Sequence, residues 1–107
     1  MERYTTRQKK NIADVIGFHY RKSLRQIETI ASDGGIISDQ NAYEDAIRYV
    51  NTVDRALKDC SNETKFIIRN GILIIPEPGW YEEVYSKNTF YRLRKKAIEE
   101  FLNCLKH

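Results

Sequence analysis

The stretch that decides the fold is Trp80-Tyr-Glu-Glu-Val-Tyr-Ser-Lys-Asn-Thr-Phe-Tyr-Arg-Leu-Arg-Lys-Lys-Ala-Ile-Glu-Glu-Phe101. From residue 90 onward, apolar residues recur at every third or fourth position, the spacing of one face of an α-helix, at Phe90, Leu93, Ala97, Phe101 and Leu105. Ser86 or Asn88 can cap this helix. Residues 80 to 85 provide length for about two further helical turns, with acids near their start. We therefore expect a short helix, a tight turn at residues 85 to 87 and a longer basic helix.

A long amphipathic helix is predicted near the start of the chain. Apolar residues at positions 12, 16, 20, 24, 27 and 30 follow helical spacing, and Thr5 or Thr6 can serve as the N-cap. Gly17 costs such a helix about 1 kcal/mol relative to alanine, so it is a candidate position for a bend. The pair Gly34-Gly35 then ends the pattern and opens a loop.

A second helix follows that loop and shows the clearest helical pattern in the chain. Asp39 is its candidate cap. Its apolar positions again recur at every third or fourth residue, at Tyr43, Ala46, Ile47, Val50, Val53 and Leu57. This helix is long enough to pair with the first along its length.

A third helix is predicted to begin at Ser61, with Phe66 and Ile67 facing inward and Ile68 as a further candidate. Two interpretations of the following Asn70-Gly71 pair remain open. Between two apolar runs, Asn-Gly is typical of a β-hairpin turn. It is equally suited to a left-handed cap at the end of a short helix, followed by a proline-rich loop. We favour the helix and keep the hairpin as the alternative for residues 66 to 75.

These patterns together predict an all-α protein, a small helical domain with a long N-terminal helix and a C-terminal helix-turn-helix. Its 107 residues fit a single domain, 1–107, with a helical arm at 1–35 and a helical core at 39–105. The helix-turn-helix is expected at 80–103. The longest apolar run, residues 72 to 75, is far too short to span a membrane, and the N-terminus has no apolar segment typical of a secretory signal. We therefore expect a cytoplasmic protein that has no membrane partner.

Few residues are available for catalysis or for metal binding. The chain has two cysteines, Cys60 and Cys104, and neither belongs to a Cys-x-x-Cys pair, so both are expected to be reduced packing residues. Its two histidines are His19, expected at the surface or at the boundary of the core, and His107. No Ser/His/Asp set, glycine-rich phosphate loop or zinc spacing is present. We expect no enzymatic activity, no cofactor and no metal.

Charge is unevenly distributed along the chain, although the net charge is only +3. Residues 1 to 25 contain seven Lys and Arg against two acids, residues 26 to 64 three against eight, and residues 65 to 107 eight against five. Both ends are therefore basic and the middle is acidic. This asymmetry indicates either an anionic partner or association between unlike surfaces.

The C-terminal helix concentrates its positive charge in its first half. In a helix-turn-helix, the second helix presents its N-terminal residues to the major groove of DNA. Asn88 and Arg92 can make paired hydrogen bonds to base edges, whereas lysines and hydroxyl groups contact the phosphate backbone. The candidate DNA-binding residues are Lys87, Asn88, Thr89, Tyr91, Arg92, Lys95 and Lys96. The simpler interpretation is that these charges only solvate an exposed helical face.

The same segment resembles a known family. Residues 85 to 101 are similar to the ending of phage late-gene transcriptional regulators of the ArpU and RinA type, which themselves resemble sigma factor region 4. The likeness extends upstream to Tyr43–Leu57 and Ile67–Asn70 and covers roughly residues 43 to 103, although residues 71 to 79 are more apolar than that pattern. The resemblance implies a helical regulator that binds promoter DNA through its last two helices and acts with RNA polymerase. It places the recognition positions on Lys87, Asn88, Thr89, Tyr91, Arg92 and Lys95.

Two functions therefore follow from the sequence. The first is a transcriptional regulator that binds double-stranded DNA, with RNA polymerase as a second partner and a homodimer as a plausible assembly, since one motif contacts few base pairs. The alternative is a helical protein-interaction module, or a phage structural or packaging accessory protein, that does not bind DNA.

Overall fold

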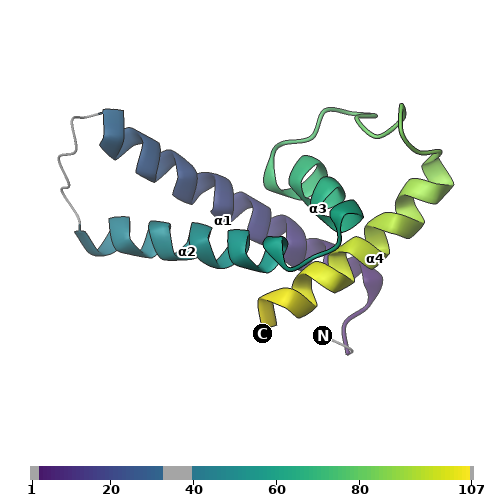
Figure 1. The fold of residues 1–107 in the computed structure, drawn as a ribbon, viewed down its shortest axis with the longest axis horizontal. Coiled ribbons are helices and arrows are strands. Elements are labelled where there is room, and N and C mark those ends of the chain that lie inside the picture. The colour runs from purple at the N-terminus through teal and green to yellow at the C-terminus, as the bar shows by residue number, and fades with distance from the viewer. Residues whose placement is uncertain (1–2, 33–39, 107) are drawn as a thin grey trace.

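The computed structural model describes residues 3 to 32 and 40 to 106. Four α-helices and one π-helical turn follow one another there: α1 (Thr6–Ser32), α2 (Gln40–Lys58), α3 (Asn62–Ile68), η1 (Arg69–Leu73) and α4 (Lys87–Lys106), as Figure 1 shows. No strand occurs in the described ranges. The predicted all-α class and the long N-terminal helix are confirmed.

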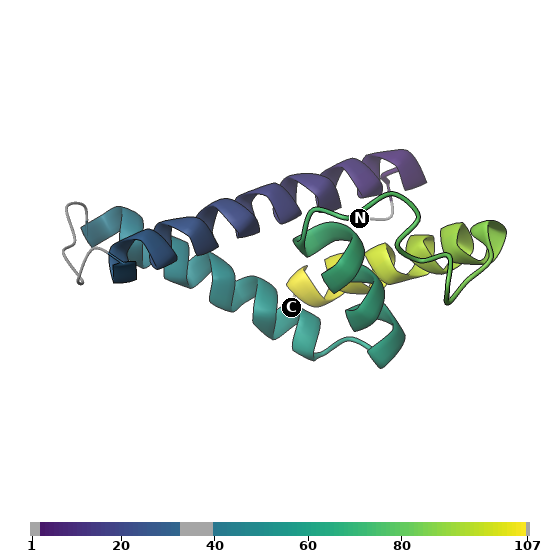
Figure 2. The same cartoon turned by 90° about the horizontal axis from the view of Figure 1, so that it is seen from above.

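The molecule consists of a helical core and of a helix pair, formed by α1 and α2, that projects from it. α1 and α2 run antiparallel and lie side by side in both views, while α3 and α4 pack at the end where α1 begins (Figure 1, Figure 2). The radius of gyration is 15.3 Å, whereas a compact domain of this length has a value of about 13 Å. The difference reflects the antiparallel pair formed by the end of α1 and the start of α2, which extends beyond the core (Figure 1).

The core lies where α1, the end of α2, α3 with η1, and α4 meet. Its largest fully buried side chains are Phe101, Leu57, Ile67, Ile68, Leu102 and Val53. α1 contributes mainly small residues, Ala13 and Gly17, and both are buried. Small residues allow the backbone of α1 to approach η1 closely.

Gly17 marks the closest approach between α1 and η1. A Cβ atom at this position would clash with the backbone carbonyl oxygen of Ile72. Arg21, one turn further along α1, donates a hydrogen bond from its guanidinium to the same carbonyl at 2.8 Å. α1 continues without interruption through this point. The glycine therefore serves the crossing of two helices, a role that helical periodicity alone does not reveal.

Three of the predicted helix starts are confirmed with their caps. At α1, the Thr5 hydroxyl accepts a hydrogen bond from the Gln8 amide at 3.1 Å, and the Gln8 side chain accepts one from the Thr5 amide at 2.8 Å, a reciprocal capping box. Ser61 accepts from the Thr64 amide at the start of α3. Ser86, the first of the two candidates for α4, accepts from the Thr89 amide. The Asp39 cap and the Gly34-Gly35 loop lie outside the described residues.

Asn70-Gly71 forms neither the hairpin turn nor the left-handed cap. The helix continues through both residues as η1, and the only glycine with a positive φ among the described residues is Gly79. A Cβ atom on Gly71 would come within 3.0 Å of the indole ring of Trp80. The glycine thus makes room for an aromatic ring, and the hairpin is excluded because residues 66 to 73 are helical.

The expected helix at residues 80 to 85 is wrong. Residues 78 to 84 form consecutive turns whose amides bond mainly three residues back, as from Trp80 to Glu77 and from Glu82 to Gly79. A segment this short gains too few hydrogen bonds to offset helix nucleation. Residues 74 to 86 therefore form a loop, and the helical element that precedes α4 is α3 with η1. This connection is longer than the tight turn expected at residues 85 to 87.

Two details of the predicted apolar faces also differ. Phe66, expected to face inward, is 38% exposed and covers the loop, with its ring centroid 5.7 Å from that of Trp80. In α4, the predicted stripe omitted Ile98 and Leu102, which are buried at 3% and 2% exposure. α4 is thus buried on more than one side in its second half, because α1 and α2 both pack against it.

Candidate nucleic-acid interface

The first half of α4 lies at the edge of the molecule (Figure 1, Figure 2), and its exposed side chains form a cationic surface. Among the predicted contact residues, the exposed ones are Lys87, Asn88, Tyr91, Arg92, Lys95 and Lys96. None of the three ion pairs found among the described residues involves any of them. The charges of the four cations among them, Lys87, Arg92, Lys95 and Lys96, are therefore open to a partner.

Thr89 is the one predicted contact residue that is not freely exposed. It is half-buried, and its hydroxyl accepts a hydrogen bond from the Ser86 hydroxyl at 2.9 Å. Ser86 in turn accepts from the backbone amide of Thr89 at 3.3 Å. Thr89 thus belongs to the cap of α4, and its first role is to fix where the helix begins.

An aromatic cluster supports the exposed half of α4 from beneath. We define it by the rings of Phe66, Trp80, Tyr81, Tyr85 and Phe90. Tyr81 stacks on Phe90 with centroids 3.8 Å apart and planes 4° apart, and Trp80 meets the same ring edge-on at 5.4 Å. Ring pairs of this kind contribute about 0.5–1.5 kcal/mol beyond the area that they bury. The loop before α4 therefore holds the helix through ring contacts.

Arg94 adds a cation that the sequence did not single out. Its guanidinium lies 4.8 Å from the centre of the Tyr91 ring and 5.9 Å from that of Phe90. Tyr81 carries no negative charge at pH 7, as is usual for a phenol, and burial, followed by a hydrogen bond with Tyr91, raises its pKa further. The surface around Tyr91 therefore keeps its positive sign.

The basic N-terminal end of α1 lies beside this surface. A small hollow between α1 and α4 is lined by residues from both helices, including Lys9, Lys10, Tyr91, Arg94 and Lys95. The two basic ends of the chain therefore lie next to each other in space. The spacing of residues in the sequence could not establish this contact.

Carboxylates partly balance the α1 contribution. Lys9 pairs with Glu99 of α4 at 3.4 Å, and Lys10 pairs with Asp14 at 2.6 Å. Arg7 is exposed and takes part in none of the ion pairs of the described residues. α1 thus adds one unpaired cation, Arg7, to the positive surface. Its Lys9 also neutralises Glu99, one of the two acids that follow this surface on α4.

The described ranges hold no group of three or more His, Cys, Asp and Glu side chains arranged to bind a metal ion. The two cysteines are far apart in sequence but adjacent in space, with their Sγ atoms 3.6 Å apart, and both are free thiols. Burial, and then the contact with Cys104, raise the pKa of Cys60 to about 12. Within residues 3 to 32 and 40 to 106, no helix combines the length and the apolar character needed to cross a membrane.

Comparison with known proteins gives no relative for this chain: no family model, no curated protein and no solved structure matches it.

Proposed function

We infer that this chain is a cytoplasmic, non-enzymatic protein that binds double-stranded DNA through the first half of α4 and regulates transcription. The observation that supports this proposal is the row of exposed, unpaired cations on residues 87 to 96, a segment without a single acid. Ten helical residues span about 15 Å. The major groove, about 12 Å wide, accepts a helix inserted by one end in this manner.

The residue types suit separate tasks at such an interface. Arg92 and Asn88 can pair with base edges, whereas Lys87, Lys95 and Lys96 neutralise phosphates. The N-terminal end of α1 adds Arg7 at the flank, where it can meet the neighbouring phosphate backbone. RNA polymerase and a second copy of the chain remain proposed partners, and light scattering in the presence and absence of DNA tests the second of these.

A salt titration tests DNA binding directly. We propose to measure the anisotropy of a fluorescein-labelled duplex of about 20 base pairs, two helical turns, in salt from about 50 to 200 mM. The chain should bind at low salt. The double variant Arg92→Ala/Lys95→Ala should lower the salt slope by about one, through the phosphate contact of Lys95, and weaken binding by about one to two orders of magnitude.

The matched control is Arg55→Ala/Lys58→Ala, which removes the same two residue types from the exposed face of α2. Both double variants lower the net charge by the same amount, so only a local role of α4 separates them. Absence of binding at low salt contradicts the proposal. Equal loss in both double variants shows that net charge, and not the α4 surface, attracts the duplex.

The alternative function is a helical protein-interaction module or phage accessory protein. It is favoured by exposed apolar residues away from α4, such as Val15 and Phe18 on α1, which are 55% and 52% exposed. Under this alternative, Arg92→Ala/Lys95→Ala leaves the binding of a protein partner intact. Loss of protein and DNA binding together would indicate one shared surface.

A further inference from the structure

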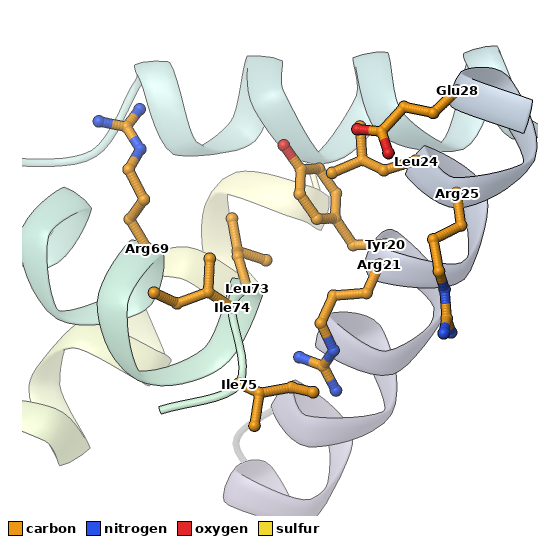
Figure 3. Close-up of a pocket in the computed structure, with 9 residues that line it drawn as sticks. All are labelled: Tyr20, Arg21, Leu24, Arg25, Glu28, Arg69, Leu73, Ile74 and Ile75. Atoms are coloured by element: carbon orange, nitrogen blue, oxygen red, sulfur yellow. The ribbon is translucent and has the colours of Figure 1, made fainter. Parts of the chain in front are cut away.

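A groove separate from the α4 surface runs along α1, opposite the end of η1 (Figure 3). Its volume is about 520 Å³, and it is open to solvent along one side. One wall is a face of α1 that includes Leu24 and Arg25, and the other is formed by Arg69, Leu73, Ile74 and Ile75. The proposed DNA-binding surface on α4 does not include this part of the chain.

The shape of the groove suits an elongated occupant. The residues that α1 contributes recur at helical spacing, with Arg21 and Arg25 forming one row and Tyr20, Leu24 and Glu28 the other. They span two turns of α1, or about 12 Å. An open channel of this length along α1 can accept a further helix laid beside it.

The floor and lip of the groove are apolar. Leu73 is buried, Leu24 is half-buried, and the next two residues after η1, Ile74 and Ile75, are 51% and 77% exposed. Covering these two isoleucine side chains removes apolar surface from water, which favours association. Two adjacent isoleucines in water, at the mouth of a groove, are typical of an interaction site.

The rim of the groove is basic. Arg21 is held in place by its hydrogen bond to the carbonyl of Ile72. Arg25 and Arg69 are exposed and take part in no ion pair among the described residues. Glu28 is the one acid among the lining residues, so the groove carries a net positive charge. Figure 3 shows Arg21 and Arg25 on one wall and Arg69 on the other.

We propose that this groove docks an acidic amphipathic α-helix of a partner protein. Arg21 and Arg25 lie one helical turn apart, so they match two carboxylates one turn apart on a helix beside α1. The apolar face of that helix covers Ile74 and Ile75. Charge complementarity favours an acidic occupant, since no basic or neutral helix satisfies the arginines.

The test uses two synthetic peptides of about 18 residues, long enough to populate a helix. The first places leucines at every third or fourth position and glutamates one turn apart beside them. The second has lysine in place of each glutamate. Anisotropy of the fluorescein-labelled peptides with the full chain measures binding, for which we expect a dissociation constant on the order of 10 µM for the acidic peptide.

Two groove variants and two matched controls identify the site. Ile75→Asp should weaken the acidic peptide at least about tenfold, a difference of about 1.4 kcal/mol. Arg25→Glu should weaken the acidic peptide and strengthen the lysine peptide. The controls Val15→Asp and Lys22→Glu make the same chemical changes at exposed α1 positions that do not line the groove, and they should leave binding unchanged.

Three results overturn the proposal. The first is no binding of the acidic peptide at millimolar concentration to a chain whose circular dichroism is native. The second is equal weakening by Ile75→Asp and Val15→Asp, which indicates non-specific apolar contact. The third is self-association in sedimentation experiments that Ile75→Asp abolishes, without peptide binding, because the groove then serves a second copy of this chain.

Discussion

Residues 87 to 96 and residues 97 to 106 belong to one continuous helix, yet their surroundings differ sharply. In the first half only Phe90 is buried, whereas the second half buries Ala97, Ile98, Phe101 and Leu102. The first half has no acid, and the second has both Glu99 and Glu100. The difference arises from the elements that pack on each half: an aromatic cluster on one side of the first, and several helices around the second. A helix can thus hold a protein together at one end and remain available for binding at the other.

The sharpest way to test this division is to remove a buried ring from the second half. Phe101 is 0% exposed, so Phe101→Ala should lower the free energy of unfolding by about 3–5 kcal/mol. Urea denaturation followed by circular dichroism measures the change. The control is Tyr91→Ala in the first half, which should cost less than about 1 kcal/mol because the ring is exposed. Comparable losses in the two variants would contradict the division.

The support beneath the first half can be weakened separately. Tyr81→Ala removes the ring that stacks on Phe90, and we expect a loss of about 1–2 kcal/mol in stability together with weaker DNA binding. Tyr81→Phe keeps the ring and should restore both properties. Denaturation midpoints and duplex anisotropy provide the two readouts. If Tyr81→Ala changes neither, the ring stack does not position α4.

The second half is also fastened to α3 by a carboxylate. Glu100 accepts hydrogen bonds from the Ser61 amide at 2.9 Å and from the Ser61 hydroxyl at 3.1 Å. Burial raises its pKa, but the hydrogen bonds from Thr64 and Ser61 outweigh that effect, so the pKa of Glu100 is lowered overall. The stabilisation is therefore complete above the pKa of the unfolded chain and is lost as the pH falls through the folded value.

Glu100→Gln should consequently cost about 1 kcal/mol at pH 7, a value reduced for solvent screening because the carboxylate is partly exposed. The cost should shrink as the pH falls below the ordinary pKa of glutamate and on through the lower pKa of the folded chain, where the wild-type carboxylate also gains a proton. Urea midpoints across this pH range give the measurement, with Glu83→Gln on the exposed loop as the control. A cost that does not depend on pH would contradict a role for the charge.

The smallest change in stability is expected for a single exposed lysine of the first half. Lys96→Ala should shift the free energy of unfolding by less than about 0.5 kcal/mol. It should nevertheless lower the slope of duplex affinity against salt by about one, since one phosphate contact is lost. Lys106→Ala, in the second half, removes the same charge and should leave the slope unchanged. A larger change in the salt slope for Lys106→Ala than for Lys96→Ala would contradict the proposal that the first half of α4 binds the duplex.

Much of this fold could be predicted from the sequence, because amphipathic spacing and cap residues act over short distances. The starts at Thr5, Ser61 and Ser86 follow from single side chains that satisfy nearby amides. The turns at residues 78 to 84 were not predictable in the same manner. The segment is too short to offset helix nucleation, and contacts of Trp80 with Phe66 of α3 and of Tyr81 with Phe90 of α4 hold the turns in place.

The candidate site was predictable only in part for a related reason. Exposure of Lys87, Arg92 and their neighbours follows from the amphipathic pattern of α4. The approach of Lys9 to Glu99, across 90 residues, depends on how α1 crosses the core. Likewise, nothing local indicates that Ile74 and Ile75 remain exposed beside the arginines of α1. DNA binding itself stays a prediction.

α1 crosses η1 at Gly17, a position between the two surfaces to which α1 contributes residues. Lys9 and Lys10, which approach α4, precede this residue, and Arg21 and Arg25, which line the groove, follow it. Since the carbonyl of Ile72 occupies the space of a side chain at the crossing, the two backbones are in direct contact there. A rigid tilt of α1 about this point moves its two ends in opposite directions, so such a tilt changes the hollow beside α4 and the groove beside η1 together.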